Sequence, residues 1–133
     1  MVTRAINTDK APKAIGPYSQ AIFYDSRYTM ELSGQIGIDP TTGKMIEGGL
    51  EAQTRQVLEN MGAVLERVGW DFSNIVKTRI YLTDMANYAT VNRIYAERFR
   101  CDPPARVAVA VSGLPADALI EIEAIAAGST TSI

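Results

Sequence analysis

The sequence has no histidine and a single cysteine, Cys101, among its 133 residues. Without histidine it cannot form the Ser-His or Cys-His pairs that activate a nucleophile, and one thiolate cannot enclose a zinc ion. One cysteine also excludes an internal disulfide, which suits a reducing compartment. Because Cys101 precedes an aspartate and has no histidine beside it, we expect an inert thiol. We therefore expect any chemistry on small molecules to proceed without a metal or a bound cofactor.

Long runs of basic residues and long runs of apolar residues are also missing. The 13 basic and 15 acidic residues are interspersed and give a net charge of -2, so no basic run indicates a nucleic-acid partner. No apolar run approaches the roughly 18 residues that span a bilayer, and the first residues lack the apolar core of a secretory signal. We expect a cytoplasmic protein with neither a membrane nor a nucleic acid among its partners.

Apolar residues are abundant enough for a hydrophobic core. They make up 47% of the chain, and a chain of this length commonly forms one domain. No internal repeat, low-complexity stretch or linker divides it. We expect a single domain over residues 1–133, with residues 128–133 as a loose C-terminal tail.

Two segments show the spacing of amphipathic helices. In residues 50–68 apolar side chains recur on one face of a 3.6-residue period, and Gly69 follows where a helix commonly ends. Asn87 is a suitable cap for a second helix over residues 88–99, which two prolines then stop. The inner face of this second helix carries Tyr88, Val91, Tyr95 and Phe99.

Other segments favour β-strands. Residues 25–27 are typical of a hairpin turn between strands at residues 21–24 and 28–32. Apolar residues alternate with polar or small ones in residues 106–111 and 119–126, as they do in strands, and residues 2–6 and 75–82 complete the set. With the two helices, these strands predict an α+β fold in which both helices pack on one face of a mixed β-sheet.

The alternation in residues 106–111 produces one row of small side chains. Arg106, Ala108 and Ala110 face one way, and the valines between them face the other way. Small side chains permit another subunit to approach closely, so this row is consistent with an oligomer.

Arg106 and Glu121 are the first candidates for chemistry. A guanidinium beside small residues has space to bind a carboxylate through two hydrogen bonds, and a carboxylate on an apolar strand is able to hold and polarise a water. An ordinary surface ion pair is the commoner explanation of such an arginine, and a solvent-facing strand position that of such a glutamate. Glu123 has the same place in the alternation, so the pattern does not choose between the two glutamates.

Four further residues are candidate ligand contacts. Asn92 lies near the inner face of the second helix, where its amide needs a partner. Ser33 and Gly34 end a strand and permit close backbone approach, and Tyr18 follows a Gly-Pro pair in a loop. Each also has a structural explanation, namely a local hydrogen bond, a turn and a packed tyrosine.

Short blocks of residues along nearly the whole chain, about residues 5–127, form a specific ordered set. They are Ile15-Gly16-Pro17-Tyr18-Ser19-Gln20-Ala21, Ser33-Gly34-Gln35-Ile36-Gly37, Asp39-Pro40 with Thr42-Gly43, Asn60-Met61, Val76-Lys77-Thr78, Leu82 and Asp84, Tyr88 with Val91-Asn92 and Tyr95, Pro104-Ala105-Arg106, Leu114-Pro115 and Ile120-Glu121-Ile122-Glu123-Ala124-Ile125-Ala126. In this order and spacing, the blocks resemble the Rid (reactive intermediate deaminase A, YjgF-like) family.

The resemblance implies a chorismate-mutase-like fold and a homotrimer with clefts between its subunits. It also implies a 2-iminobutanoate/2-iminopropanoate deaminase, which hydrolyses reactive 2-imino acids to 2-oxo acids and ammonia. These imines arise from enamines that pyridoxal-phosphate-dependent dehydratases release. By position in the family pattern, Arg106 grips the substrate carboxylate and Glu121, rather than Glu123, orients the attacking water. The same carry-over places Tyr18, Ser33, Gly34 and Asn92 in the substrate pocket.

The sequence departs from the family at two positions, and two other functions are alternatives. Ala108 stands where many members carry a cysteine, so thiol-dependent behaviour should be absent, and Glu31 occupies a strand position that is usually apolar. A trimeric module that binds small carboxylates without turnover would need Arg106 but not Glu121. A ribonuclease or translation inhibitor, activities reported for some relatives, fits an acidic chain without histidine less well.

Overall fold

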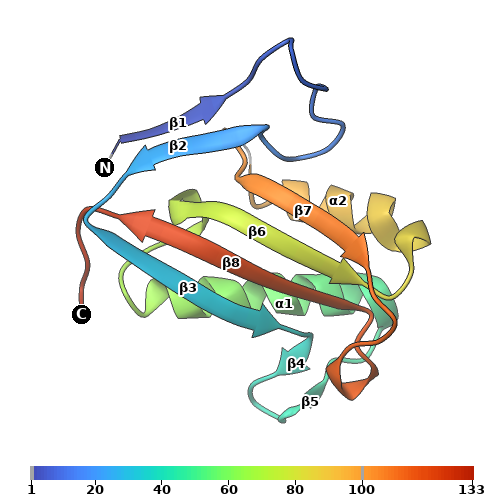
Figure 1. Ribbon diagram of the computed structural model, residues 1–133. Helices are drawn as coiled ribbons and strands as arrows, with labels where there is room; N and C mark the ends of the chain where they lie inside the picture. The colour runs from blue at the N-terminus through green and yellow to red at the C-terminus, as the bar shows by residue number, and fades with distance from the viewer. Residues whose placement is uncertain (1, 100) are drawn as a thin grey trace.

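The centre of the protein is a four-stranded β-sheet in the order β3-β8-β6-β7 (Figure 1). The computed structural model describes residues 2–99 and 101–133. Strands β6 and β7 are parallel, whereas β8 is antiparallel to both of its neighbours, so the sheet is mixed. The four strands are β3 (Tyr28–Gln35), β6 (Ile75–Leu82), β7 (Ala105–Ala110) and β8 (Ile120–Gly128).

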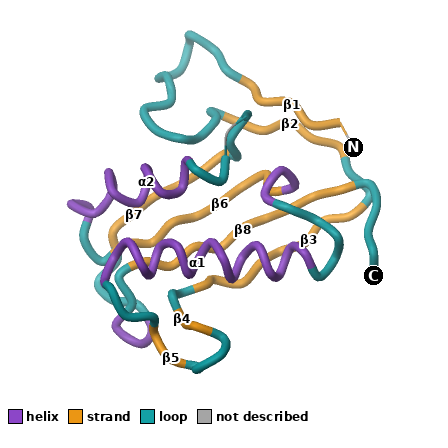
Figure 2. Tube along the Cα trace, turned by 180° about the vertical axis from the view of Figure 1, so that it is seen from behind, coloured by secondary structure: helices purple, strands orange, loops and turns teal. Residues whose placement is uncertain are grey.

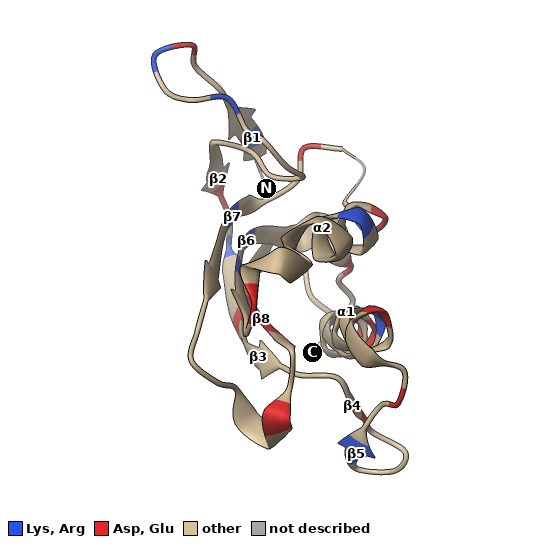
Figure 3. Cartoon of the chain, turned by 90° about the vertical axis from the view of Figure 1, so that its right-hand side faces the viewer, with Lys and Arg blue, Asp and Glu red and all other residues tan. Residues whose placement is uncertain are grey.

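Two α-helices cover one face of this sheet, as Figures 2 and 3 show from behind and from the side. Helix α1 spans Gly49–Glu66, and α2 spans Tyr88–Ala96 and so ends before the predicted Phe99. The predicted α+β fold, with two helices packed on one face of a mixed sheet, is therefore confirmed. Among the described residues, no helix combines the length and the apolar character that a membrane crossing requires.

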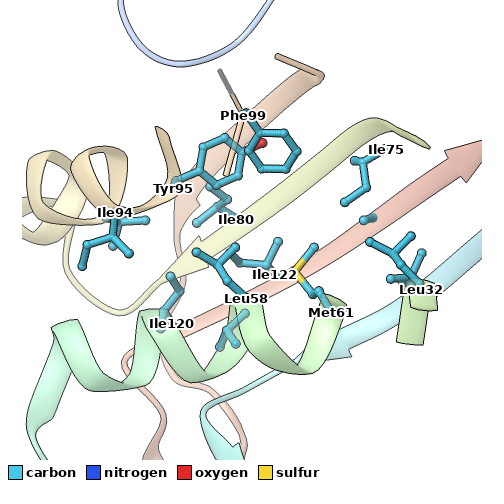
Figure 4. Close-up of a cluster of buried hydrophobic side chains, with 14 of the residues drawn as sticks. Leu32, Leu58, Met61, Ile75, Ile80, Ile94, Tyr95, Phe99, Ile120 and Ile122 are labelled. Carbon is cyan, nitrogen blue, oxygen red and sulfur yellow. The ribbon is translucent and has the colours of Figure 1, made fainter. Parts of the chain in front are cut away.

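The hydrophobic core lies between the helices and the sheet. On β8, the buried Ile120 and Ile122 alternate with glutamates that point away from the helices. Figure 4 shows Leu58 and Met61 of α1 packed against this inner face of the sheet. Full burial of an aliphatic side chain of this size contributes about 1.5–3 kcal/mol, so the alternation fixes which side of each strand faces inward.

The other face of the sheet, which we call the open face, carries mostly charged and polar side chains. No helix in the described part of the chain covers it. Register and alternation place the following residues on it: Glu31, Lys77, Arg79, Tyr81, Val107, Val109, Glu121, Glu123 and Ile125. The departure at Glu31 thus adds an exposed carboxylate to this face.

The row of small residues on β7 does not lie on the open face. Ala108 pairs in register with Ile80, which is only 1% exposed, and it packs against the core beneath the helices. The exposed side chains of this strand are instead Val107 and Val109, at 42% and 41%. Any second subunit that approaches the open face therefore meets the valines and not the alanine row.

The N-terminal part of the chain forms a separate two-stranded arm. Strand β1 (Val2–Ile6) pairs antiparallel with β2 (Ala21–Asp25), while β3 pairs with β8. The predicted hairpin between residues 21–24 and 28–32 is therefore wrong, although the turn itself exists. Ser26 Oγ lies 2.5 Å from the carbonyl of Tyr28 and 3.2 Å from that of Gly128, so its single hydroxyl hydrogen is shared between two carbonyls where β3 pairs with the end of β8. In this arrangement Leu32 of β3 is buried beside Ala124 of β8.

A short hairpin and a pinned C-terminus complete the chain. Strands β4 (Ile38–Asp39) and β5 (Lys44–Met45) flank a turn that includes Gly43 at a φ of 72°. Residues 128–133, which we expected to be loose, are instead held against the body. Trp70 donates from Nε1 to the carbonyl of Thr130 at 2.7 Å, and the amide of Ser132 donates to the carbonyl of Val68 at 3.1 Å.

We predict that Gly128→Ala lowers the free energy of unfolding by about 1–3 kcal/mol, because it overpacks a buried contact. A Cβ at Gly128 would lie 2.8 Å from Cε2 of Trp70, whose ring is held in place by its hydrogen bond to Thr130. Urea unfolding measures the change. The control is Gly113→Ala, where the added methyl meets nothing within 4 Å. Equal stability of the two variants would contradict this account of the packing.

Candidate active site

Arg106 lies under α2 at the edge of the sheet. It pairs in register with Thr78, which is fully buried, so its side chain leaves β7 on the helix side. Its Nη1 donates to Oδ1 of Asn92 at 2.8 Å, and its Nη2 donates to the hydroxyl of Tyr88 at 2.8 Å. Both acceptors belong to α2 and stand four residues apart, which places them on one face of the helix.

Three tyrosine rings surround the same guanidinium. Cζ of Arg106 lies 5.2 Å from the ring centroid of Tyr18, 5.5 Å from that of Tyr88 and 5.2 Å from that of Tyr95. A cation within about 6 Å of an aromatic face is attracted by the ring quadrupole. Burial raises the pKa of Tyr95 to about 12, so this ring stays neutral over the whole physiological range.

The loop that carries Tyr18 is attached to the beginning of β7. Ser19 donates from Oγ to the carbonyl of Pro103 at 2.6 Å, and its amide donates to the carbonyl of Pro104 at 3.3 Å. These bonds bring Gly16 so close to the arginine that a Cβ there would lie 3.2 Å from Nη2. The loop and the strand therefore position the guanidinium together, although they are far apart in sequence.

The charge of Arg106 is not neutralised by any carboxylate in the described part of the chain. Its hydrogen-bond partners are a hydroxyl and an amide, and the other groups close to it are aromatic rings. Four other arginines differ in this respect, because each of the four pairs with a glutamate: Arg55 with Glu97, Arg79 with Glu123, Arg93 with Glu51 and Arg98 with Glu59. A fixed, uncompensated guanidinium is suited to bind an anion.

Glu121 lies on the open face, opposite the side from which Arg106 emerges. It pairs with Tyr81 of β6, which alternates with the buried Ile80 and Leu82. The carboxylate reaches Gly34, where a Cβ would lie 2.8 Å from Cδ of Glu121. Only a residue without a side chain leaves room for the carboxylate at this point.

Ser33 and Gly34 form an irregular part of β3. Leu32 pairs with Ala124 and Gln35 pairs with Ile122, so β3 contains one extra residue relative to β8 between these positions. Such a β-bulge bends the strand and alters the direction of its side chains. Both residues of the bulge are exposed, and Gly34 lies against the Glu121 carboxylate, so backbone of the bulge is accessible next to this group.

The two glutamates of β8 differ in their neighbours. Glu123 accepts a hydrogen bond from the hydroxyl of Tyr81 and forms an ion pair with Arg79 at 3.6 Å. The hydrogen bond to Glu123 raises the pKa of Tyr81. Among the described residues, no side chain forms a hydrogen bond or an ion pair with Glu121. Glu121 is therefore the more available carboxylate of the two. The alternation of the strand could not distinguish them, because both glutamates lie on the same face.

The candidate residues fall into two clusters on opposite faces of the sheet. The arginine cluster consists of Tyr18, Asn92 and Arg106 together with Gly16, Tyr88 and Tyr95, which the sequence analysis did not propose as site residues. The glutamate cluster consists of Ser33, Gly34 and Glu121. Tyr88, Asn92 and Tyr95 follow a spacing of i, i+4 and i+7 on α2, and this spacing is the signal from which their common position could have been inferred. One chain does not bring the two clusters together.

Within residues 2–99 and 101–133, histidine, cysteine and acidic side chains form no group of three suited to hold a metal ion. Cys101 is exposed and lies outside both clusters.

Comparison with known proteins relates this chain to one family over nearly its whole length. The family described as Endoribonuclease L-PSP matches residues 8–128. The 2-iminobutanoate/2-iminopropanoate deaminase of Homo sapiens is 48% identical over 126 residues, which cover 95% of this chain and 90% of that protein.

Two solved structures are similar over almost their full length. A putative endoribonuclease of Thermotoga maritima has a TM-score of 0.74 and 47% identity, with 95% of this chain and 98% of that chain covered. A Rid-family protein of Yersinia pestis has a TM-score of 0.72 and 49% identity, with 95% and 99% covered. Since sequence, fold and residue blocks agree over nearly the whole chain, this protein belongs to the Endoribonuclease L-PSP (Rid, YjgF-like) family.

Proposed function

We propose that the protein hydrolyses reactive 2-imino acids, such as 2-iminobutanoate and 2-iminopropanoate, to 2-oxo acids and ammonia. The observation that carries the proposal is the uncompensated Arg106, held by neutral partners in a partly buried position. A 2-imino acid has a carboxylate next to its C=N carbon, so binding the carboxylate also positions the reacting carbon. The 48% identity to a human protein named for this activity supports the same assignment.

The substrate carboxylate binds to the N–H groups of Arg106 that Asn92 and Tyr88 leave free. Charge-assisted hydrogen bonds to a planar guanidinium fix both the position and the orientation of a carboxylate. Tyr18 lies beside the arginine and closes one side of this half of the site. Ser33 and Gly34 line the other half, next to the water-binding carboxylate.

Glu121 orients the attacking water and accepts one of its protons. The oxygen of the water forms a bond to the imine carbon, and the electron pair of the C=N bond moves to nitrogen. In the resulting carbinolamine, Glu121 returns this proton to the nitrogen, which leaves as ammonia. The hydroxyl of the carbinolamine gives its own proton to the Glu121 carboxylate as the C=O bond forms, and this proton passes to the departing ammonia, so that Glu121 is a carboxylate again. Because an iminium carbon is already electrophilic, positioning and one proton acceptor are sufficient, and no covalent nucleophile is needed.

The two clusters meet only if two copies of the chain contribute to one site. Within one chain, the sheet separates the arginine cluster from the glutamate cluster. We therefore propose a homotrimer in which Arg106, Tyr18 and Asn92 of one subunit face Glu121, Ser33 and Gly34 of the next. A closed cyclic assembly repeats this head-to-tail contact and creates equivalent clefts at every interface.

We predict that Arg106→Lys lowers kcat/KM by about 10- to 100-fold, because charged hydrogen bonds to the substrate are lost. Glu121→Gln should lower kcat by about 10²- to 10⁴-fold, the range for loss of a general base. A threonine dehydratase supplies 2-iminobutanoate in situ, semicarbazide traps the free imine, and suppressed semicarbazone formation reports hydrolysis. Glu123→Gln is the matched control, since Glu123 is occupied by Tyr81 and Arg79.

If Glu121→Gln kept full activity and Glu123→Gln lost activity, Glu123 and not Glu121 would be the residue that orients the water. If the wild-type protein suppresses no semicarbazone but binds 2-oxobutanoate through Arg106, the protein is a carboxylate-binding module. Binding and turnover are therefore measured on the same preparation.

We predict that two inactive variants complement each other when they assemble together. Arg106→Ala and Glu121→Gln are each inactive, but a co-refolded equal mixture should recover about a quarter of the wild-type rate if each site is shared by two subunits, since half of each contribution is intact. The coupled assay measures the recovery. A mixture as inactive as its components would show that each site belongs to one chain.

We predict that Gly34→Ala lowers kcat by about 10- to 100-fold with little change in stability, because misplacement of a reacting group by about 1 Å has effects of this size. The added Cβ would lie 2.8 Å from Cδ of Glu121, which is the mobile end of a flexible side chain, so the carboxylate moves and the fold does not. Gly113→Ala serves as the control because its methyl has open space. Unchanged kcat in Gly34→Ala would argue against a catalytic role for the Glu121 carboxylate in its present position.

A further inference from the structure

We propose that Tyr88 is a positioning residue whose hydroxyl sets the orientation of Arg106 and thereby the affinity for the substrate carboxylate. This inference rests on the proposed function, in which Arg106 binds that carboxylate. Neither the motif blocks nor the alternation of the strands gives Tyr88 a role beyond packing on the inner face of α2. In the structure its hydroxyl accepts a hydrogen bond from Nη2 of Arg106 at 2.8 Å.

The two acceptors of the guanidinium act at different nitrogens. Asn92 accepts from Nη1 and Tyr88 accepts from Nη2, so both terminal nitrogens are fixed from the α2 side. A guanidinium has five N–H donors in one plane. After these two bonds, each terminal nitrogen keeps one N–H, and Nε keeps its own. With only one of the acceptors, the plane could still rotate about the remaining bond.

A neutral acceptor is chemically necessary at this position. A carboxylate at residue 88 would hold Nη2 equally well, but it would neutralise the charge that attracts the substrate. A hydroxyl accepts the hydrogen bond and leaves the positive charge in place. The ring of Tyr88, 5.5 Å from Cζ, adds attraction without adding negative charge.

The surroundings of the hydroxyl leave little space for a substitute. A Cβ at Gly16 would lie 3.5 Å from the Tyr88 hydroxyl and 3.2 Å from Nη2, so the backbone of the loop closes this side. Removal of the hydroxyl therefore leaves Nη2 without an acceptor rather than exchanging one side chain for another. The guanidinium then samples more than one orientation. Binding the carboxylate has to fix it in one of them, and the lost conformational entropy weakens binding.

Tyr88→Phe tests the proposal, because it removes the hydroxyl but keeps the ring that packs against the core. We expect the KM for 2-iminobutanoate and the Kd for 2-oxobutanoate to rise about 3- to 10-fold, the usual effect of one hydrogen bond. We expect kcat to change less than about twofold, since the interaction is equal in ground and transition states. The melting temperature should stay close to that of the wild type. Tyr24→Phe, which removes a hydroxyl from the N-terminal arm, is the matched control.

A spectroscopic measurement separates positioning from packing. In the wild-type protein, the 15N signals of Nη1 and Nη2 of Arg106, assigned by their loss in Arg106→Lys, should be distinct because rotation about the Nε–Cζ bond is hindered. In Tyr88→Phe they should merge or broaden. Distinct signals in Tyr88→Phe, or unchanged KM and Kd, would overturn the proposal, as would a fall in kcat without a change in KM.

This design also distinguishes failure of the inference from failure of the proposed function. If the wild-type protein neither binds 2-oxobutanoate nor hydrolyses imines, the proposed function is wrong. The signals of Arg106 still decide whether Tyr88 holds the guanidinium. If the wild-type protein is active and Tyr88→Phe equals it in every measurement, only the positioning role is wrong.

Discussion

The alternation of side chains across the central sheet is the constraint on which the arrangement of the candidate site depends. Burial of Ile120 and Ile122 against the helices forces the glutamates of β8 onto the open face. On β7, pairing with the buried Thr78 directs Arg106 to the opposite side. A shift of one residue in either strand would exchange the faces, but it would also expose the core. The free energy of core burial therefore also fixes the separation of the two charged groups.

This separation is the reason for proposing a homotrimer. A site that needs a guanidinium and a carboxylate a few ångströms apart cannot form across a sheet whose core-facing side is filled with aliphatic side chains. The exposed valines of β7 and the charged residues of the open face are surfaces that a neighbouring subunit can cover. In this view the assembly completes the site, and the loss of the assembly would remove activity even if each chain stayed folded.

Local patterns predicted the elements of the fold better than their pairing. The helical period in residues 50–68 and the alternation in residues 119–126 correspond to α1 and β8, because both patterns reflect burial on one side of a single element. The hairpin prediction failed because a turn signal records only local geometry. The partner of β3 is β8, and that choice depends on contacts between residues that are distant in sequence, such as Leu32 and Ala124.

For the candidate site too, the sequence predicted the residues, but their neighbours depend on contacts between distant parts of the chain. The residue blocks identified Arg106 and Glu121 through their resemblance to a family, whereas the alternation alone treated Glu121 and Glu123 as equivalent. The difference between the two glutamates comes from Tyr81 and Arg79 on the adjacent strand, and only the register of β6 against β8 brings these residues into contact with Glu123. The catalytic roles stay predictions, but the difference in availability is a property of the structure.

The environment of Arg106 also bears on the simplest alternative, that of an ordinary surface arginine. The exposed Arg55 and Arg93 pair with glutamates, which costs little because both groups of each pair remain hydrated. Arg106 is partly buried, and it has neutral acceptors and three aromatic rings where a carboxylate would stabilise it more. Such an arrangement forgoes some folding free energy and leaves a fixed positive charge at the edge of the sheet. A carboxylate-bearing ligand supplies the missing counter-charge, so the arginine is better explained as half of a binding site than as a structural ion pair.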